Sequence, residues 1–249
     1  MSRRHRAKPA SWHLGLMLAL TFSTGIIDAV GFLGLDRVFT ANMTGNVVIL
    51  GMGLAGAQDL PILGPAAALA AFMLGAAAGG FSLRRRSAGE WSATMTVLLG
   101  VVGLLLLAIG IAVLLVETPG EAALLAITGT LAGAMGLQAA AARTLAVKDV
   151  TTVVITSTIT GLAADLWLRN TQGNVRRRAS VVLLMLAGAV AGAALLQVHL
   201  GAGLIVAAVI CFACAILGHL FGRERPGTDA RDQRLEAHTG PELSKTISL

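Results

Sequence analysis

Asp28 is the residue of this chain whose type and position could most directly do chemistry. It lies between Gly25 and Gly31, well inside an apolar stretch that begins near Leu14. A carboxylate is costly to keep charged in hydrocarbon, so it must face a bundle interior, pair with another group or carry a proton. One interpretation is that Asp28 relays a proton or cation, or anchors a substrate. The other is structural: it makes an interhelical hydrogen bond or lies near the outer end of a tilted helix.

Two polar stretches of similar composition stand 112 positions apart. Residues 38–46 return without a gap as residues 150–158, and both stretches are rich in hydroxyl side chains. Polar segments placed symmetrically in two halves of a membrane protein are the best sequence pointer to a central site. We therefore expect the two stretches to face each other and, with Asp28, to line a midplane pathway, although Thr and Ser also cap short helices. The expected pathway residues are Thr40, Asn42, Thr44, Gly45 and Asn46 in the first stretch, and Thr152, Thr156, Ser157 and Thr158 in the second.

Three further features have a functional and a structural interpretation. Gln138 lies in a later apolar stretch, near the place that Asp28 occupies in the first; it could hydrogen-bond the same ligand or join two helices. Asp165 and Arg169 stand four positions apart and are predicted to pair along one helix face. Cys211 and Cys214 fall inside the last apolar stretch, where a free cysteine packs as a small hydrophobe.

Motifs of nucleophilic, metal-dependent or nucleotide-driven catalysis are missing from the sequence. It holds no G-x-S-x-G, no H-E-x-x-H and no Walker A pattern. We therefore expect no catalytic residue, no metal and no cofactor. Any transport would be driven by a gradient.

The composition indicates the elements that must position these residues. Of the 249 residues, 55% are hydrophobic and 13% charged, whereas about 25% of a soluble domain is charged. Apolar runs of about 20 residues, the length that a helix needs to cross a hydrocarbon core of ~30 Å, recur along the chain. An all-α, polytopic membrane helix bundle is predicted, with close packing at Gly75-x-x-x-Gly79 and Gly188-x-x-x-Gly192. Six runs are long, at about 13–35, 61–83, 92–116, 121–142, 179–198 and 202–222, and two shorter ones, at about 38–56 and 150–168, hold the polar stretches.

The basic residues indicate which runs cross the membrane. If the two short runs do not cross, every Lys and Arg except Arg37 lies on one side, as the positive-inside rule requires of the cytoplasmic face. If they do cross, the residues outside are Arg37, Arg84, Arg85, Arg86, Arg143 and Lys148. The first arrangement is favoured: six spans plus two re-entrant or broken segments in a bacterial inner membrane, with both termini cytoplasmic. The net charge of +6 thus reflects orientation, and no nucleic-acid partner is expected.

The loops indicate two inverted repeats. Residues 57–66 hold no basic residue, but their counterparts at 169–178 hold four arginines. Equivalent loops with opposite basic content face opposite sides, which three spans per half allow and four do not. The predicted organisation is a cytoplasmic N-terminus (1–12), a first membrane repeat (13–116), a second membrane repeat (117–222) and a disordered cytoplasmic tail (223–249).

At several of these residues the chain resembles a known family, the YoaK-like family of uncharacterised bacterial membrane proteins, domain-of-unknown-function family 1275. The similar stretches are Gly25–Phe32, Asn42–Asn46 and Gly136–Gln138, followed by the hydroxyl run Thr151–Thr160. The resemblance covers about residues 15–222 and implies a six-span membrane protein, without an established activity. The second half departs from the family, which often has Gln-Asn and Thr-Gly where this chain has Gln138-Ala139 and Thr156-Ser157.

Together these features predict a transporter or channel that moves an unidentified small solute or ion through a midplane polar site. Its partners would be the lipid bilayer and that solute or ion, and a homo-oligomer is left open. Two alternatives are also left open: a membrane-embedded enzyme that acts on a lipid with Asp28 and Asp165 as its carboxylates, and a non-transporting accessory or scaffold protein.

Overall fold

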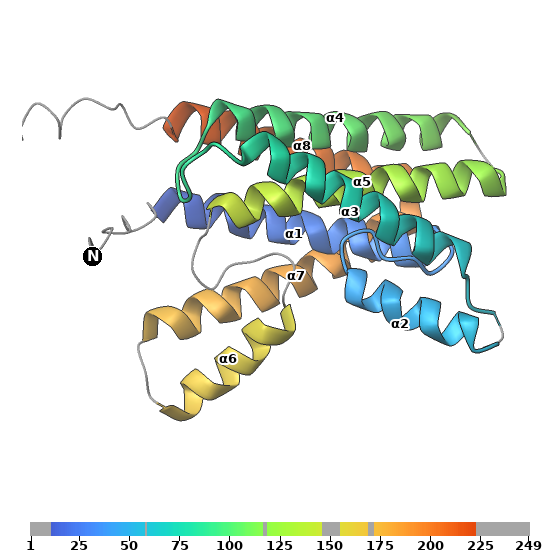
Figure 1. Cartoon of the computed structure of the whole chain (residues 1–249), viewed down its shortest axis with the longest axis horizontal. Coiled ribbons are helices and arrows are strands. Elements are labelled where there is room, and N and C mark those ends of the chain that lie inside the picture. Colours follow the sequence, from blue (N-terminus) through green and yellow to red (C-terminus); the bar gives the residue numbers. More distant parts are fainter. Residues whose placement is uncertain (1–10, 58, 117–118, 146–154, 169–171, 223–249) are drawn as a thin grey trace, which may run out of the picture.

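The structure is a computed structural model that describes residues 11–57, 59–116, 119–145, 155–168 and 172–222. In these residues it contains eight α-helices and no strand, which confirms the all-α class (Figure 1). The predicted tail, most of the N-terminal segment, Thr152 and Arg169 lie outside the described residues. The helices are α1 (Ser11–Gly34), α2 (Met43–Leu54), α3 (Leu63–Leu83), α4 (Ala93–Leu115), α5 (Glu121–Leu145), α6 (Ile155–Leu168), α7 (Gln172–Val198) and α8 (Leu200–Phe221).

Six of the described helices are long and apolar enough to cross a membrane, namely α1, α3, α4, α5, α7 and α8. The six long runs of the sequence are thereby confirmed as six candidate spans. The described parts of the two short runs hold the shorter helices α2, of 12 residues, and α6, of 14. At 1.5 Å per residue these described helices reach about 18 and 21 Å, less than the ~30 Å of hydrocarbon. The helix α2 nevertheless exposes large apolar side chains, Val47, Val48 and Leu54.

The spans pack in three long pairs, α1 with α7, α3 with α5 and α4 with α8, while α1 also contacts α8 and α4 contacts α5. Successive spans run in opposite directions, so α1 begins and α8 ends at the same end of the bundle (Figure 1). There the rings of Trp12 and Trp91 lie 6.0 Å apart. The most apolar part of α1 is 67% buried, against 17–44% for the other five spans. The first span is therefore the central helix of the bundle.

Glycines bring all three of these pairs into backbone contact, and on α4–α8 a Cβ on Gly201 would meet the carbonyl of Gly110. On α1–α7 and on α3–α5, a Cβ atom added to the glycine of one helix would collide with a backbone carbonyl of the other. Small residues of this kind let membrane helices approach closely. The close packing predicted at Gly75 and Gly188 is confirmed. The colliding pairs are Gly25 with Met185, Gly188 with Phe22, Gly75 with Gly133, and Gly136 with Phe72.

The chain reverses sharply after α1. Asp36 and Arg37 both have a left-handed backbone, with φ of 54° and 57°, a conformation that costs an L-residue roughly 1–2 kcal/mol. The turn brings the following residues back alongside α1 before α2 begins (Figure 1). Asn42 then caps α2, because its side chain accepts the N–H of Gly45.

We expect Gly75→Ala to destabilise the bundle, because the new methyl group would meet the carbonyl of Gly133 on α5. Overpacking of this kind costs roughly 1–3 kcal/mol, which is about 2–12 °C in the unfolding midpoint of a chain of this size. Gly80→Ala is the matched control, since on the same helix its Cβ would have nothing within 4 Å. The midpoint is measured by size exclusion of heated, detergent-purified protein; equal midpoints for the two variants would contradict the glycine contact.

Candidate functional site

The central helix α1 carries much of the buried polar chemistry. Among the described residues, ten polar or charged side chains are buried, and half of them lie on α1. Polar groups inside a membrane bundle mark a pathway, a binding site or interhelical hydrogen bonds. The five on α1 are His13, Thr21, Ser23, Thr24 and Asp28.

Asp28 holds the segment that follows α1. Its Oδ1 accepts the backbone N–H groups of Thr40 (3.0 Å), Ala41 (2.7 Å) and Asn42 (3.4 Å), and the Thr40 hydroxyl lies 3.4 Å away. These donors lie just before the N-terminus of α2, where unpaired N–H groups favour a negative charge. The side chain is buried, with 5% exposure. No hydrogen bond within the described part of the chain reaches Oδ2, which leaves this oxygen available as an acceptor.

Asn46 fixes the same segment from the α2 side. Its Oδ1 accepts the N–H of Phe39 at 2.9 Å, and its Nδ2 donates to the carbonyl of Phe39 at 2.6 Å. One side-chain amide thus pairs with both backbone groups of one residue, as a neighbouring strand would. Asp28 and Asn46 together satisfy four consecutive N–H groups, from Phe39 to Asn42.

A second polar cluster lies one helical turn from Asp28, where α1, α5 and α8 meet. Gln138 Nε2 donates to the Thr24 hydroxyl at 3.1 Å, and the Cys211 thiol donates to Gln138 Oε1 at 3.4 Å. Thr24 precedes Asp28 by four residues and therefore shares its helix face. We call the group Thr24, Asp28, Gln138 and Cys211 the α1–α5 seam. Sequence reasoning missed Thr24 and the bond to Cys211, although the four-residue spacing from Asp28 would have indicated Thr24.

The second polar stretch lies elsewhere. The helix α6 packs on α7 and α2 packs on α3, and the two short helices make no contact in the described residues. Thr156 and Ser157 are exposed on α6, whereas Thr158 is buried. In the described residues the two stretches are not brought together, because each short helix packs on the span that follows it; Thr152 lies outside the described residues. The structure groups Asp28, Thr40, Asn46 and Gln138, and leaves Thr44 on the surface of α2.

The carboxylate of Asp165 has a partner on another helix. Arg178 of α7 donates to it at 2.8 Å, and the two side chains are 18% and 16% exposed. The guanidinium lies over Gly161, where any Cβ would collide with it. The predicted partner, Arg169, lies outside the described residues. This ion pair joins α6 to α7.

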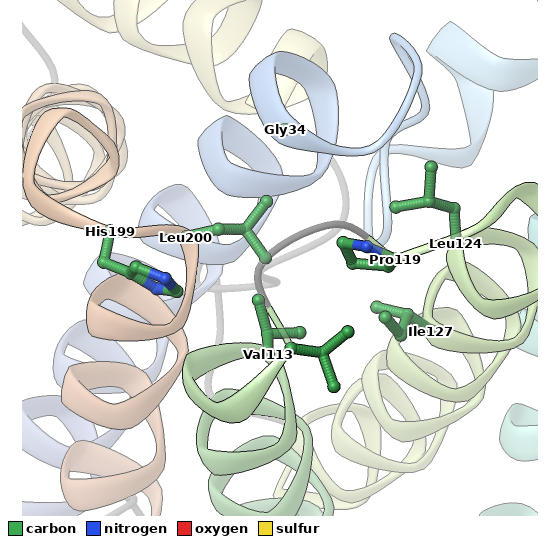
Figure 2. Close-up of a pocket in the computed structure, with 8 residues that line it drawn as sticks. Gly34, Val113, Pro119, Leu124, Ile127, His199 and Leu200 are labelled. Carbon is green, nitrogen blue, oxygen red and sulfur yellow. The ribbon is translucent and has the colours of Figure 1, made fainter.

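An apolar cavity of about 170 Å³ opens at the end of α1 (Figure 2). Apolar side chains of α4, α5 and α8 converge on it, and His199 lies on its wall. His199 is occupied as the cap of α8, since its Nδ1 accepts the N–H of Gly201 at 3.1 Å. The lining holds no charged residue, so the seam is the better candidate for binding an ion. The lining residues are Gly34, Val113, Val116, Pro119, Leu124, Ile127, His199 and Leu200.

Comparison with known proteins gives the chain a family. Residues 16–217 match the family described as "Protein of unknown function (DUF1275)". The chain is also similar to the "UPF0700 transmembrane protein YoaK" of Bacillus subtilis (strain 168), with 26% identity over 158 residues, 63% of this chain and 68% of that protein. No solved structure matches the chain. These similarities and the six candidate spans identify a multi-pass membrane protein of unknown function.

We expect Asn46→Asp to speed hydrogen exchange of the segment at Phe39, because a carboxylate cannot donate to the Phe39 carbonyl that the Asn46 amide now satisfies. An unmade buried hydrogen bond costs about 1–3 kcal/mol. Asn42→Asp makes the same chemical change four residues earlier, but there it keeps the acceptor for Gly45 N–H at a helix N-terminus and should be neutral. Hydrogen exchange of the peptide that spans Phe39 measures the difference. Equal exchange in both variants would show that the amide pairing does not hold the segment.

Proposed function

This chain belongs to the DUF1275 family, and we propose that it moves a small solute or ion across the membrane along the α1–α5 seam. The observation that carries the proposal is the free Oδ2 of a buried carboxylate on the most buried span. Asp28 has backbone and hydroxyl donors but no basic partner in the described residues. A buried negative charge of this kind attracts a proton or a cation. Asp28 is then the group that binds the transported or coupling ion, and Thr24, Thr40 and Gln138 lie beside it.

Two matching glycine contacts support an inverted repeat around the seam. A Cβ on Gly25 would meet the carbonyl of Met185 and the nitrogen of Ala189, while one on Gly136 would meet those atoms of Phe72 and Ala76. Gly136 stands 111 positions after Gly25, and Met185 and Ala189 each stand 113 positions after Phe72 and Ala76. Exchange of α1 with α5 and of α3 with α7 therefore relates one contact to the other. With three spans per half, the two halves cross the membrane in opposite directions, and such repeats hold their sites at the interface between halves.

The arrangement of the short helices and basic clusters supports an orientation. The helices α2 and α6 lie toward opposite ends of the bundle (Figure 1). The arginines 84–86 follow the end of α3, Arg143 lies in the last turn of α5, and the arginines 176–178 lie near the start of α7; these helix ends are at the end of the bundle where α1 begins. The positive-inside rule assigns this end to the cytoplasm and α2 to the outer half of an inner membrane.

The enzyme alternative is less well supported. Asp28 and Asp165 would have to act on one substrate, but Asp165 on α6 forms an ion pair with Arg178 on α7. The scaffold alternative is consistent with the same hydrogen bonds, because Asp28 and Asn46 would also fix residues 39–42 in a purely structural protein. Transport measurements on an Asp28 variant separate these functions.

We expect Asp28→Asn to lower cation flux at least about tenfold, because the amide keeps an acceptor for the segment but carries no charge for an ion. Proteoliposomes are tested for proton flux with a trapped pH-sensitive dye, and for radioactive sodium and rubidium uptake. Asp36→Asn removes an exposed carboxylate from the same loop and should keep the flux of the unmodified protein. Equal flux in Asp28→Asn would remove the carboxylate from the mechanism. If Asp28→Leu folds normally and leaves the cellular phenotype unchanged, the scaffold function is favoured. If the detergent-solubilised protein turns over a lipid, the enzyme function is favoured.

We expect a cysteine at Ala57 to react with an impermeant maleimide from outside intact cells, and a cysteine at Ser87 to react only after lysis. The two positions flank α3, a span, and both are exposed. Cys211 and Cys214 are replaced first, so that the introduced thiol alone is labelled. Reaction of Ser87→Cys from outside, with Ala57→Cys protected, would reverse the orientation and contradict the assignment of α2 to the outer half.

A further inference from the structure

We infer that residues Leu35–Asn42, here called the gate segment, form a gate at the α2 end of the seam, and that the charge of Asp28 holds this gate closed. The inference rests on the proposed function, and it adds how the site is regulated. A gate must fill a space between spans, have its backbone hydrogen bonds made by a small number of groups, and be released by an event at the site. The gate segment meets each of these conditions.

Val38 is the part of the gate segment that fills space. Its side chain is 1% exposed and packs against Ala68 of α3 and Ala132 of α5. Two glycines leave room for it: a Cβ on Gly31 would come within 2.9 Å of the Val38 carbonyl, and one on Gly64 within 2.8 Å of Val38 Cγ2. The segment thus fills the space between α1, α3 and α5 beside Asp28.

The backbone N–H groups in the second half of the gate segment are held by side chains outside it, while Arg37 donates to the Asp59 carbonyl at 3.2 Å and Phe39 stacks on Phe32. The N–H groups of Phe39 to Asn42 go to Asn46 and Asp28. The segment begins with the left-handed pair Asp36 and Arg37, which a relaxed loop would not keep. The hydrogen bonding of these four N–H groups therefore depends on two side chains, Asp28 and Asn46, and the turn that precedes the groups is strained.

The charge of Asp28 provides the release. Hydrogen bonds to a charged acceptor are about twice as strong as those between neutral groups. A proton or a monovalent cation at Oδ2 neutralises the carboxylate and weakens its hold on three N–H groups at once. The other ionisable side chains of the segment, Asp36 and Arg37, are exposed. Loading of the site and opening of the gate are therefore the same event.

The gate belongs to the first half of the chain. Ala139 stands 111 positions after Asp28, the offset that relates Gly25 to Gly136, so the second half has no carboxylate at this place. There the short helix α6 is tied to α7 by Asp165 and Arg178. Charge-controlled opening is thus confined to one end of the seam.

The native thiol of Cys211 reports whether water reaches the seam. It is buried and hydrogen-bonded to Gln138, and Cys214→Ala leaves it as the single thiol of the chain. The rate at which a small, water-soluble methanethiosulfonate reagent modifies Cys211 is measured in full-length protein in proteoliposomes. Because the rate follows the open population, Asp28→Asn and Asn46→Ala should each raise it at least about tenfold. Asp36→Asn, which removes a charge from the same segment without touching either holding group, should leave the rate unchanged.

Hydrogen exchange of residues 39–42 is measured on the same variants, each first checked for a monodisperse elution profile. Faster hydrogen exchange of residues 39–42 together with faster modification of Cys211 supports the gate. If Asp28→Asn does not fold, the same two measurements on Asn46→Ala test the gate. Faster exchange with an unchanged modification rate overturns it, because the segment would move without opening the seam. Unchanged rates in both measurements overturn it as well. If Asp28→Asn loses cation flux but the modification rate of Cys211 does not change, the transport proposal is supported and the gate is overturned. If the modification rate rises but the flux of the tested cations does not change, the gate is supported and transport of those cations is overturned.

Discussion

The bond between the Asp28 carboxylate and three backbone N–H groups is the contact on which the rest of the site depends. The segment after α1 has no helix or strand of its own, so side chains from α1 and α2 set its position. Asp28 orients Thr40 to Asn42, and Asn46 orients Phe39. The same N–H groups supply the positive potential that lets a carboxylate stay buried without a basic partner. One contact therefore joins α2 to α1 and also satisfies a carboxyl group inside the bundle.

The bundle combines strong and weak junctions. Backbone contact through Gly25 and Gly188 joins α1 to α7, and the equivalent contact joins α3 to α5. Across the seam, by contrast, α1 meets α5 through the side chains of Thr24 and Gln138. A hydrogen bond of this kind in a membrane is worth about 0.6 kcal/mol on average. Between the α1–α7 and α3–α5 pairs, the seam is thus joined by side-chain hydrogen bonds and not by glycine backbone contact, and buried polar groups lie there.

Much of the fold was predictable, because each membrane span must be a long apolar run and six such runs are visible. Asp28 was also identifiable, since its type conflicts with its surroundings. Its partners were not, because they are backbone N–H groups that a strained turn brings back. The pairing of Asp165 with Arg178 was not predictable, because the sequence shows neighbours on one helix and Arg178 reaches Asp165 from another; the predicted partner, Arg169, lies outside the described residues. The similarity of the two polar stretches did not indicate that α2 and α6 lie apart.

The short helix α2 has a consequence for the lipid around the bundle. Its exposed Val47, Val48 and Leu54 need apolar surroundings, yet its 12 residues match only part of the hydrocarbon thickness. In the orientation proposed above, lipid chains beside α2 must shorten or tilt to cover it, which would thin the bilayer there relative to the long spans. Each ångström of such mismatch costs a fraction of a kcal/mol. Shorter acyl chains relieve that cost, so the fatty-acid composition of the host membrane sets part of the free energy of this fold.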